Sequence, residues 1–257
     1  MRMLSNSTFW RGRLKAAGIQ LAISFAIAVF AALLVFLVWY PYPYREISGG
    51  RELFLLLMAV DVVLGPLMTL VVFNSKKRRR LIYFDFAVIG LLQLAALGYG
   101  IWTVAMARPV VLAFEFQRFN VVHAVEVPKE LLGLAPLELQ RLSWTGPKLL
   151  AIRDFKDNQE KMDAVMQELA GVALGARPDL WQSYEKAKSQ IIATAKPVAE
   201  LKTRFPLRAR DIDAALKLTS PNVPIGYIPL AGRNTFWTVL INTQTAEVLA
   251  FVPLDPY

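Results

Sequence analysis

Three long runs of apolar residues occupy the first part of the chain. They extend from Ala16 to Tyr40, from Leu53 to Phe73 and from Leu81 to Met106. A helix needs about 20 residues to cross the roughly 30 Å hydrocarbon layer of a membrane. Each run is long enough, so the pattern predicts three transmembrane helices, with spans of about 16–40, 53–73 and 81–106, in an anchor of residues 1–107.

The first run resembles a secretory signal because basic residues precede it. It is too long for one, however, and the aromatic and proline cluster Trp39–Tyr44 follows it instead of a small-residue cleavage site. Aromatic rings of this kind lie at the depth of the lipid headgroups. We therefore expect an uncleaved anchor.

Beyond residue 107 the apolar runs become short and periodic. Pro109–Phe116 and Val121–Val127 have the pattern of a β-hairpin. Asp157–Ala170 has the 3.6-residue period of a helix with one apolar face. Further strands are expected at 148–153, 225–230, 235–242 and 247–253, and further helices at 178–194 and 209–218. The expected fold class is a membrane α-helical anchor followed by a C-terminal α+β soluble domain, residues 108–257, with a mainly antiparallel sheet.

The charge distribution predicts the orientation of this anchor. The formal net charge is +9, and residues 1–107 contain 11 Lys and Arg against four acidic residues. Basic residues flank the cytoplasmic ends of membrane spans. The expected topology is multi-pass in a bacterial inner membrane, with a cytoplasmic N-terminus and a periplasmic C-terminal domain. The topology determinants are Arg11, Arg13, Lys15, Lys76, Lys77, Arg78, Arg79 and Arg80.

The same basic run is also suited to binding anionic inner-membrane lipids. Nucleic acid is not an expected partner, since the surplus of basic residues lies beside apolar spans and not on a folded face with interleaved aromatic residues.

Two polar residues interrupt the apolar runs. Asp61 lies near the middle of the second run, and Gln93 lies at a similar distance from the basic turn in the third. A hydrogen bond between them would join the two helices, which is the simpler interpretation. The functional interpretation is that Asp61, Gln93 and Gly65 contact the transmembrane helix of a partner. Gly65 and Pro66 would permit a close approach or a kink.

The exported domain has no recognisable catalytic motif. The chain contains no cysteine, and its only histidine, His123, lies in a strand pattern where a satisfied structural role is the simpler interpretation. No metal-ligand cluster or phosphate loop is found, so no cofactor is expected. Trp181, Tyr184 and Trp237 fit a core better than a binding groove.

The whole arrangement resembles the TfpX/TfpZ family of type IV pilin accessory proteins. The matching stretches cover the membrane half densely and the exported half thinly: Phe36–Pro41, Arg51–Leu57, Val60–Pro66 with Thr69, Val72–Asn74, Phe84–Asp85, Leu91–Ala95, Ala107–Pro109 and Tyr227–Leu230. The resemblance implies a non-enzymatic, chaperone-like helper of a cognate major type IV pilin, acting before or during pilus assembly, with other pilus assembly proteins as further partners.

Two other classes of function stay open. A membrane-anchored periplasmic ligand-binding or sensor protein would need a cytoplasmic output module, for which the expected topology leaves little chain. A membrane enzyme that modifies pilin would need acidic groups near the membrane face, where Glu46 and Glu52 are the acids available.

Overall fold

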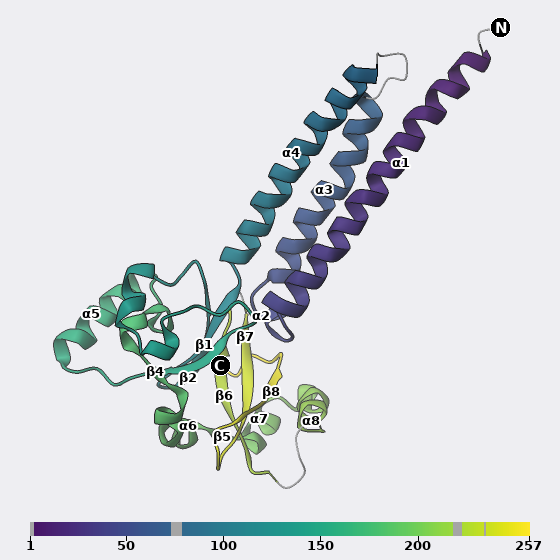
Figure 1. Ribbon diagram of the computed structural model, residues 1–257. Coiled ribbons are helices and arrows are strands. Elements are labelled where there is room, and N and C mark those ends of the chain that lie inside the picture. The colour runs from purple at the N-terminus through teal and green to yellow at the C-terminus, as the bar shows by residue number, and fades with distance from the viewer. Residues whose placement is uncertain (1–2, 73–78, 218–222, 234) are drawn as a thin grey trace. The chain divides into compact units, whose positions relative to one another are not determined.

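The computed structural model describes residues 3–72, 79–217, 223–233 and 235–257, except for some side chains within the helices. It divides into two compact units (Figure 1). One, here called the helical unit, consists of Met1–Val38 and Gly50–Ala105. The other, the sheet unit, consists of Trp39–Gly49 and Met106–Tyr257. The connection after the first long helix therefore belongs to the sheet unit.

The helical unit is built from long, largely apolar helices. Large apolar side chains such as Phe30, Leu37 and Leu91 are about 70% exposed, at 73%, 70% and 69%. A helix that is apolar on all sides is suited to a lipid environment. The rings of Phe36 and Phe54 meet edge to face at 5.0 Å. The helices are α1 (Met3–Leu33), continued by the π-helix η1 (Leu34–Trp39), α3 (Gly50–Val72) and α4 (Arg79–Met106).

The expectation of three transmembrane helices is corrected by the structure. By length and composition, two helices in the described part of the chain can cross a membrane, Ala17–Trp39 and Tyr83–Met106. The intervening residues do form the helix α3, but it is not one of these two candidate spans. It carries Glu52 in its first turn, Asp61 near its middle and Pro66 in its interior. Charged residues within an apolar run oppose membrane insertion. Proline disturbs the regular hydrogen bonding of a helix.

The sheet unit surrounds one eight-stranded sheet. Its strands are β1 (Pro109–Glu115), β2 (Arg118–His123), β3 (Lys148–Ile152), β4 (Trp181–Ser183), β5 (Lys196–Pro197), β6 (Ile225–Ala231), β7 (Phe236–Asn242) and β8 (Val248–Val252). The α-helices are α2 (Tyr44–Ile47), α5 (Asn158–Leu169), α6 (Lys188–Thr194), α7 (Val198–Arg204) and α8 (Ala209–Lys217). Short 3-10 turns are η2 (Lys129–Leu134), η3 (Leu137–Leu139), η4 (Leu174–Ala176), η5 (Pro178–Leu180), η6 (Tyr184–Ala187) and η7 (Pro206–Arg208).

The strand order is β4-β3-β1-β2-β6-β7-β8, with β5 paired to β6. The pairs β1–β3 and β2–β6 are parallel, and the others are antiparallel. The sheet is therefore mixed, which corrects the expected mainly antiparallel sheet. Parallel pairs require a crossover connection, and a pattern of short apolar runs does not indicate which strands are joined in this way.

The predicted hairpin is present, and it lies at the centre of the sheet. All seven residues of β1 are buried, as expected for a strand that is covered on both faces. Leu112 and Phe114 pack into one core cluster, whereas Val111 and Ala113 pack into another. This alternation follows from the two-residue period of a strand. The hairpin thus holds the side chains at its two ends in a rigid frame.

The segment Trp39–Gly49 is folded into the sheet unit. Tyr40 and Ile47 are fully buried, and Ile47 belongs to the same core cluster as Phe114. The ring of Tyr44 packs against that of Phe251 with centroids 5.6 Å apart. The two candidate spans end at Trp39 and Met106, so each continues directly into the sheet unit.

Candidate functional site

The predicted membrane site is described in part. Gln93 on α4 accepts a hydrogen bond at its Oε1 from Gln20 Nε2 on α1, at 2.5 Å. The Nε2 atom of Gln93 is buried and has no hydrogen-bond partner in the described residues. The surroundings of the Asp61 and Gly65 side chains on α3 lie outside the described residues. The Asp61–Gln93 hydrogen bond therefore stays a prediction.

The basic residues that are predicted to determine the topology are also described in part. Lys15 and Arg80 are exposed. The side chains of Arg11, Arg13, Lys76, Lys77, Arg78 and Arg79 lie outside the described residues. The three aromatic residues that could have lined a groove, Trp181, Tyr184 and Trp237, are buried, with exposures of 3%, 8% and 5%. They form core, as expected.

A pocket in the sheet unit was not predicted from the sequence. It is a cavity of about 410 Å³ lined by three segments of the chain. The lining comes from β2 and the turn after it, from the segment after α5 and from the β6–β7 turn: Asn120, Val121, His123, Glu126, Gly171, Val172, Ala173, Ala176, Gly232 and Arg233. A cavity of this volume is large enough for a small ligand or for a peptide side chain with its backbone.

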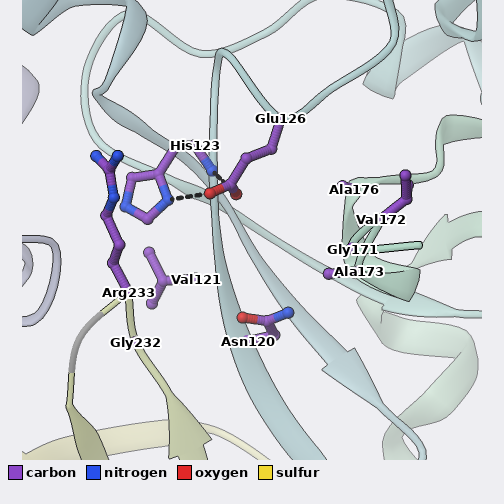
Figure 2. Close-up of a pocket in the computed structure, with 10 residues that line it drawn as sticks. All are labelled: Asn120, Val121, His123, Glu126, Gly171, Val172, Ala173, Ala176, Gly232 and Arg233. Carbon is purple, nitrogen blue, oxygen red and sulfur yellow. Dashed lines mark hydrogen bonds and ion pairs between the residues drawn. The ribbon is translucent and has the colours of Figure 1, made fainter. Parts of the chain in front are cut away.

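His123 occupies the buried wall of this pocket, where it is 1% exposed. Its Nδ1 lies 3.1 Å from Glu126 Oε1, and its backbone N–H donates to Glu126 Oε2 at 2.9 Å. Figure 2 shows the ring with Nδ1 turned to Glu126 and its opposite edge turned toward the Arg233 side chain. Because a carboxylate only accepts hydrogen bonds, Nδ1 carries a proton in this contact.

The other ring nitrogen of His123, Nε2, has no hydrogen-bond partner among the residues that the structure describes. This atom is buried. A buried polar atom without a partner costs about 1–3 kcal/mol of stability, so such atoms are rare in native folds and each calls for an explanation, of which a bound ion or ligand is one. The expectation of a satisfied structural histidine is thus met at one nitrogen and not at the other.

Two charged residues lie near His123: Glu126 contacts the ring, whereas Arg233 forms no ion pair among the described residues. Burial by itself raises the pKa of Glu126, but the hydrogen bonds from the His123 side chain and backbone, together with the nearby Arg233, leave this pKa below its ordinary value. Glu126 is therefore ionised at neutral pH and favours a proton on Nδ1. Arg233 is exposed and makes no ion pair among the described residues.

Two glycines in the pocket loops allow backbone conformations or contacts that a residue with a side chain would not. Gly171 has a φ of +92°, which other residues rarely adopt, and it turns the chain out of α5. A Cβ atom on Gly232 would lie 2.5 Å from Ile47 Cγ2 and 2.9 Å from the Ile47 carbonyl oxygen. Gly232 thus lets the β6–β7 turn, and with it Arg233, pass closely over the Trp39–Gly49 segment.

Sequence reasoning identified His123 but missed Glu126 and Arg233. A histidine followed three residues later by an acid in a turn is a weak signal, and Arg233 is 110 positions away in the chain. The pairing of β2 with β6 brings the segments together, since Asn120 lies beside Ala231. No group of three or more potential metal ligands occurs in the part of the chain that the structure describes.

Comparison with known proteins connects this chain to pilus assembly. Residues 8–49 match the family model of the fimbrial assembly protein FimB. Two fimbrial assembly proteins of Dichelobacter nodosus, of serogroups I and E1, are each 32% identical over 246 residues, which cover 95% of this chain and 95% of each relative. A third, of serogroups C1 and C2, is 39% identical over 108 residues, covering 42% of this chain and 82% of the relative.

No solved structure matches the chain significantly. The matches agree with a type IV pilus accessory protein, although they carry the fimbrial assembly name and not the TfpX/TfpZ name. The extent and identity of the alignment over both units show that the chain belongs to the fimbrial assembly protein family.

Proposed function

We propose that this protein is a non-enzymatic accessory that binds a major type IV pilin at the bacterial inner membrane and hands it to the assembly machinery. Membership of the fimbrial assembly protein family supports a role in pilus biogenesis. The observation that carries the rest is connectivity, because both candidate spans end inside the sheet unit, at Trp39 and Met106. A partner with one membrane helix and one folded head can contact both parts.

The same connectivity supports a periplasmic sheet unit. The C-terminal ends of both candidate spans lead into the sheet unit. The N-terminal end of the first candidate span follows the basic segment 11–15. Since basic flanks stay in the cytoplasm, the sheet unit is exported. A periplasmic reporter enzyme fused after Tyr257 should be active, and activity of a cytoplasmic reporter at the same position would contradict this topology.

Gln93 is the leading position for the contact with the pilin helix. Its Oε1 is engaged by Gln20, but its buried Nε2 donor has no partner among the described residues. In an apolar environment such a donor seeks an acceptor on a neighbouring helix, for a gain of about 0.6–2 kcal/mol. Asp61 and Gly65 on α3 are the other two positions proposed for the contact with pilin.

Two-part binding makes the interaction stronger than either contact. Once the helix is bound, the pilin head meets the sheet unit at a raised effective concentration, which can increase the overall affinity by about 10²–10⁴-fold. The basic flanks place inner-membrane lipids against the cytoplasmic ends of the spans, and other assembly proteins receive the pilin afterwards.

Co-purification tests the proposal. Gln93→Leu and Asp61→Leu should insert normally but recover several-fold less pilin, whereas Leu92→Ala, at an exposed position beside Gln93 on the same helix, should recover the wild-type amount. Equal pilin recovery by all variants would remove the membrane contact. Failure of the wild-type protein to retain pilin after crosslinking would remove the function itself.

The pocket favours a second function, a membrane-anchored periplasmic ligand-binding or sensor protein. The buried Nε2 of His123 is the observation in its favour. The two functions differ in what they require: a sensor responds to a ligand when pilin is absent, whereas an accessory protein binds pilin in stoichiometric amounts. Quantifying pilin per accessory protein in the crosslinked complex separates them.

A further inference from the structure

The pocket of the sheet unit has the chemistry of an anion site. Arg233 offers a guanidinium that forms no ion pair among the described residues. His123 offers a buried nitrogen, Nε2, that has no hydrogen-bond partner among the described residues. Figure 2 shows the edge of the ring that carries this nitrogen facing the Arg233 side. We propose that the pocket binds a carboxylate group of a peptide, with one oxygen on Arg233 and the other on His123 Nε2.

The tautomer of His123 decides which group can bind. Glu126 accepts a hydrogen bond from the protonated Nδ1, so Nε2 carries a proton only when the ring is doubly protonated. A bound carboxylate supplies the negative charge that stabilises this cation, and Glu126 already supplies one on the other side. In the proposed complex the ring donates from both nitrogens, from Nδ1 to Glu126 and from Nε2 to the bound carboxylate, and so bridges two carboxylates.

The other walls of the pocket agree with a peptide ligand. The loop after α5 contributes Gly171, Val172, Ala173 and Ala176, which bring no charge. Glu126 and Arg233 are the charged residues of the lining, from the hairpin and from the β6–β7 turn. The loop after α5 thus accommodates the aliphatic part of a bound residue, whereas Arg233 and His123 bind its carboxylate.

The volume of the cavity limits the size of the bound group. One lining residue, Asn120, is already engaged, because its Nδ2 donates to Glu115 Oε1 at 2.9 Å. The cavity of about 410 Å³ has room for one or two residues and not for a folded loop. An acidic side chain or a chain terminus fits these bounds, and both present the same carboxylate.

The inference goes beyond the proposed function and holds for any peptide partner. It can be tested on the full chain in detergent micelles, prepared without a histidine tag. His123 is the only histidine of the sequence, so protein labelled with ¹⁵N-histidine has one imidazole, and its NMR signals report directly on both ring nitrogens.

The probes are acetyl-aspartyl-amide, with a side-chain carboxylate, and acetyl-alanine, with a terminal carboxylate. Their matched neutral controls are acetyl-asparaginyl-amide and acetyl-alaninamide. We expect one or both carboxylate probes to move the His123 signals in a saturable way toward the doubly protonated form, and the probe with the lower Kd identifies the natural source. The amides should have no effect. Equal responses to carboxylates and amides, or a fixed His123 signal in all four titrations, would overturn the proposal.

Arg233→Gln supplies the second arm of the test. The variant should weaken the binding of the carboxylate probes about tenfold or more, since it removes a charge-assisted contact. Arg210→Gln, at an exposed arginine on α8 away from the pocket lining, is the matched control and should bind like the wild type. Equal Kd values for both variants would contradict the assigned role of Arg233. A failure of pilin recovery would leave this assay unaffected.

Discussion

Each end of the β1–β2 hairpin holds one buried ionisable side chain, and the two side chains differ in how many of their polar atoms are hydrogen-bonded. At one end the carboxylate of Glu115 accepts hydrogen bonds from Arg118 Nε at 3.0 Å, Asn120 Nδ2 at 2.9 Å and the Gly175 backbone N–H at 2.6 Å. At the other end, His123 has one partnered nitrogen and one without a partner in the described residues. The closed end stabilises the fold, whereas the open end retains a buried polar atom that a ligand can satisfy.

The largest effect is expected where the closed end is broken. Glu115 is 4% exposed, and Glu115→Gln replaces one acceptor oxygen by a donor facing other donors. We expect a loss of about 3 kcal/mol in the free energy of unfolding, at the low end for a broken buried ion pair because Arg118 is partly exposed. Urea unfolding of the full chain in micelles, followed by tryptophan fluorescence, measures it.

Glu168→Gln is the matched control for this change. Glu168 is bonded to the same arginine, through Arg118 Nη2 at 3.0 Å, but its side chain is 41% exposed. An exposed ion pair contributes at most about 1 kcal/mol. If the two variants unfolded at the same urea concentration, burial of Glu115 would not be what distinguishes the closed end.

A second test adds one methyl group to the closed end. A Cβ atom on Gly175 would lie 2.8 Å from both Ala113 Cβ and Glu115 Oε1. Gly175→Ala should therefore cost about 1–3 kcal/mol, because it overpacks a buried contact. Gly133→Ala, where a Cβ has open space, serves as the reference in the same unfolding assay. A stability gain in both variants would show that the Gly175 region can relax.

The hairpin itself was predictable, because alternating apolar positions indicate strands and the polar break at 117–120 indicates a turn. The predicted helix at 178–194 was wrong over its first half. Trp181 pairs with Ile152 in strand β4, and its indole N–H donates to the Gly175 carbonyl oxygen at 2.8 Å. Contacts between residues that are distant in sequence thus override the local helical pattern. Such contacts cannot be recognised from the periodicity of the sequence.

The helix α5 shows a different limit. Its 3.6-residue period was recognised, but the apolar side chains Met162, Met166 and Leu169 are 58%, 59% and 78% exposed. Ala164 is the buried position instead. The helix is held by ion pairs on its polar positions, Glu160 with Arg153 and Glu168 with Arg118. A hydrophobic pattern identifies a helix, yet charged contacts can decide which side faces the protein.

Of the residues that line the pocket, only His123 could be singled out from the sequence. His123 attracts attention as the only histidine, but its open nitrogen depends on the parallel pairing of β2 with β6, which places Arg233 at the same end of the hairpin. Sequence spacing contains no signal for that crossover. The membrane positions Asp61 and Gly65 were chosen from the sequence and stay predictions.

A third test concerns acid stability outside both ends of the hairpin. Arg153 donates two hydrogen bonds to Glu160, and the Lys156 backbone N–H donates a third, which lowers the pKa of Glu160 from 4.5 to about 2. The stabilisation is therefore present above pH 4.5 and is lost as the pH falls toward about 2. We expect Arg153→Met to cost about 1 kcal/mol at pH 7 and to shift this loss toward pH 4.5.

Acid titration of the free energy of unfolding checks this expectation, with Lys161→Met on the same helix as the control, since Lys161 is exposed and forms no ion pair among the described residues. Parallel pH profiles for the wild type and Arg153→Met would mean that Arg153 does not set the pKa of Glu160.

The smallest effect on stability is expected at the open end. Arg233 is exposed and contributes no ion pair among the described residues, so Arg233→Gln should change the free energy of unfolding by no more than about 0.5 kcal/mol. Arg118→Gln, the equivalent change at the closed end, should cost at least twice as much because it strips a donor from buried Glu115. Urea unfolding compares the two directly. A large loss for Arg233→Gln would mean that this arginine supports the fold, and its place in an anion pocket would then need a structural explanation.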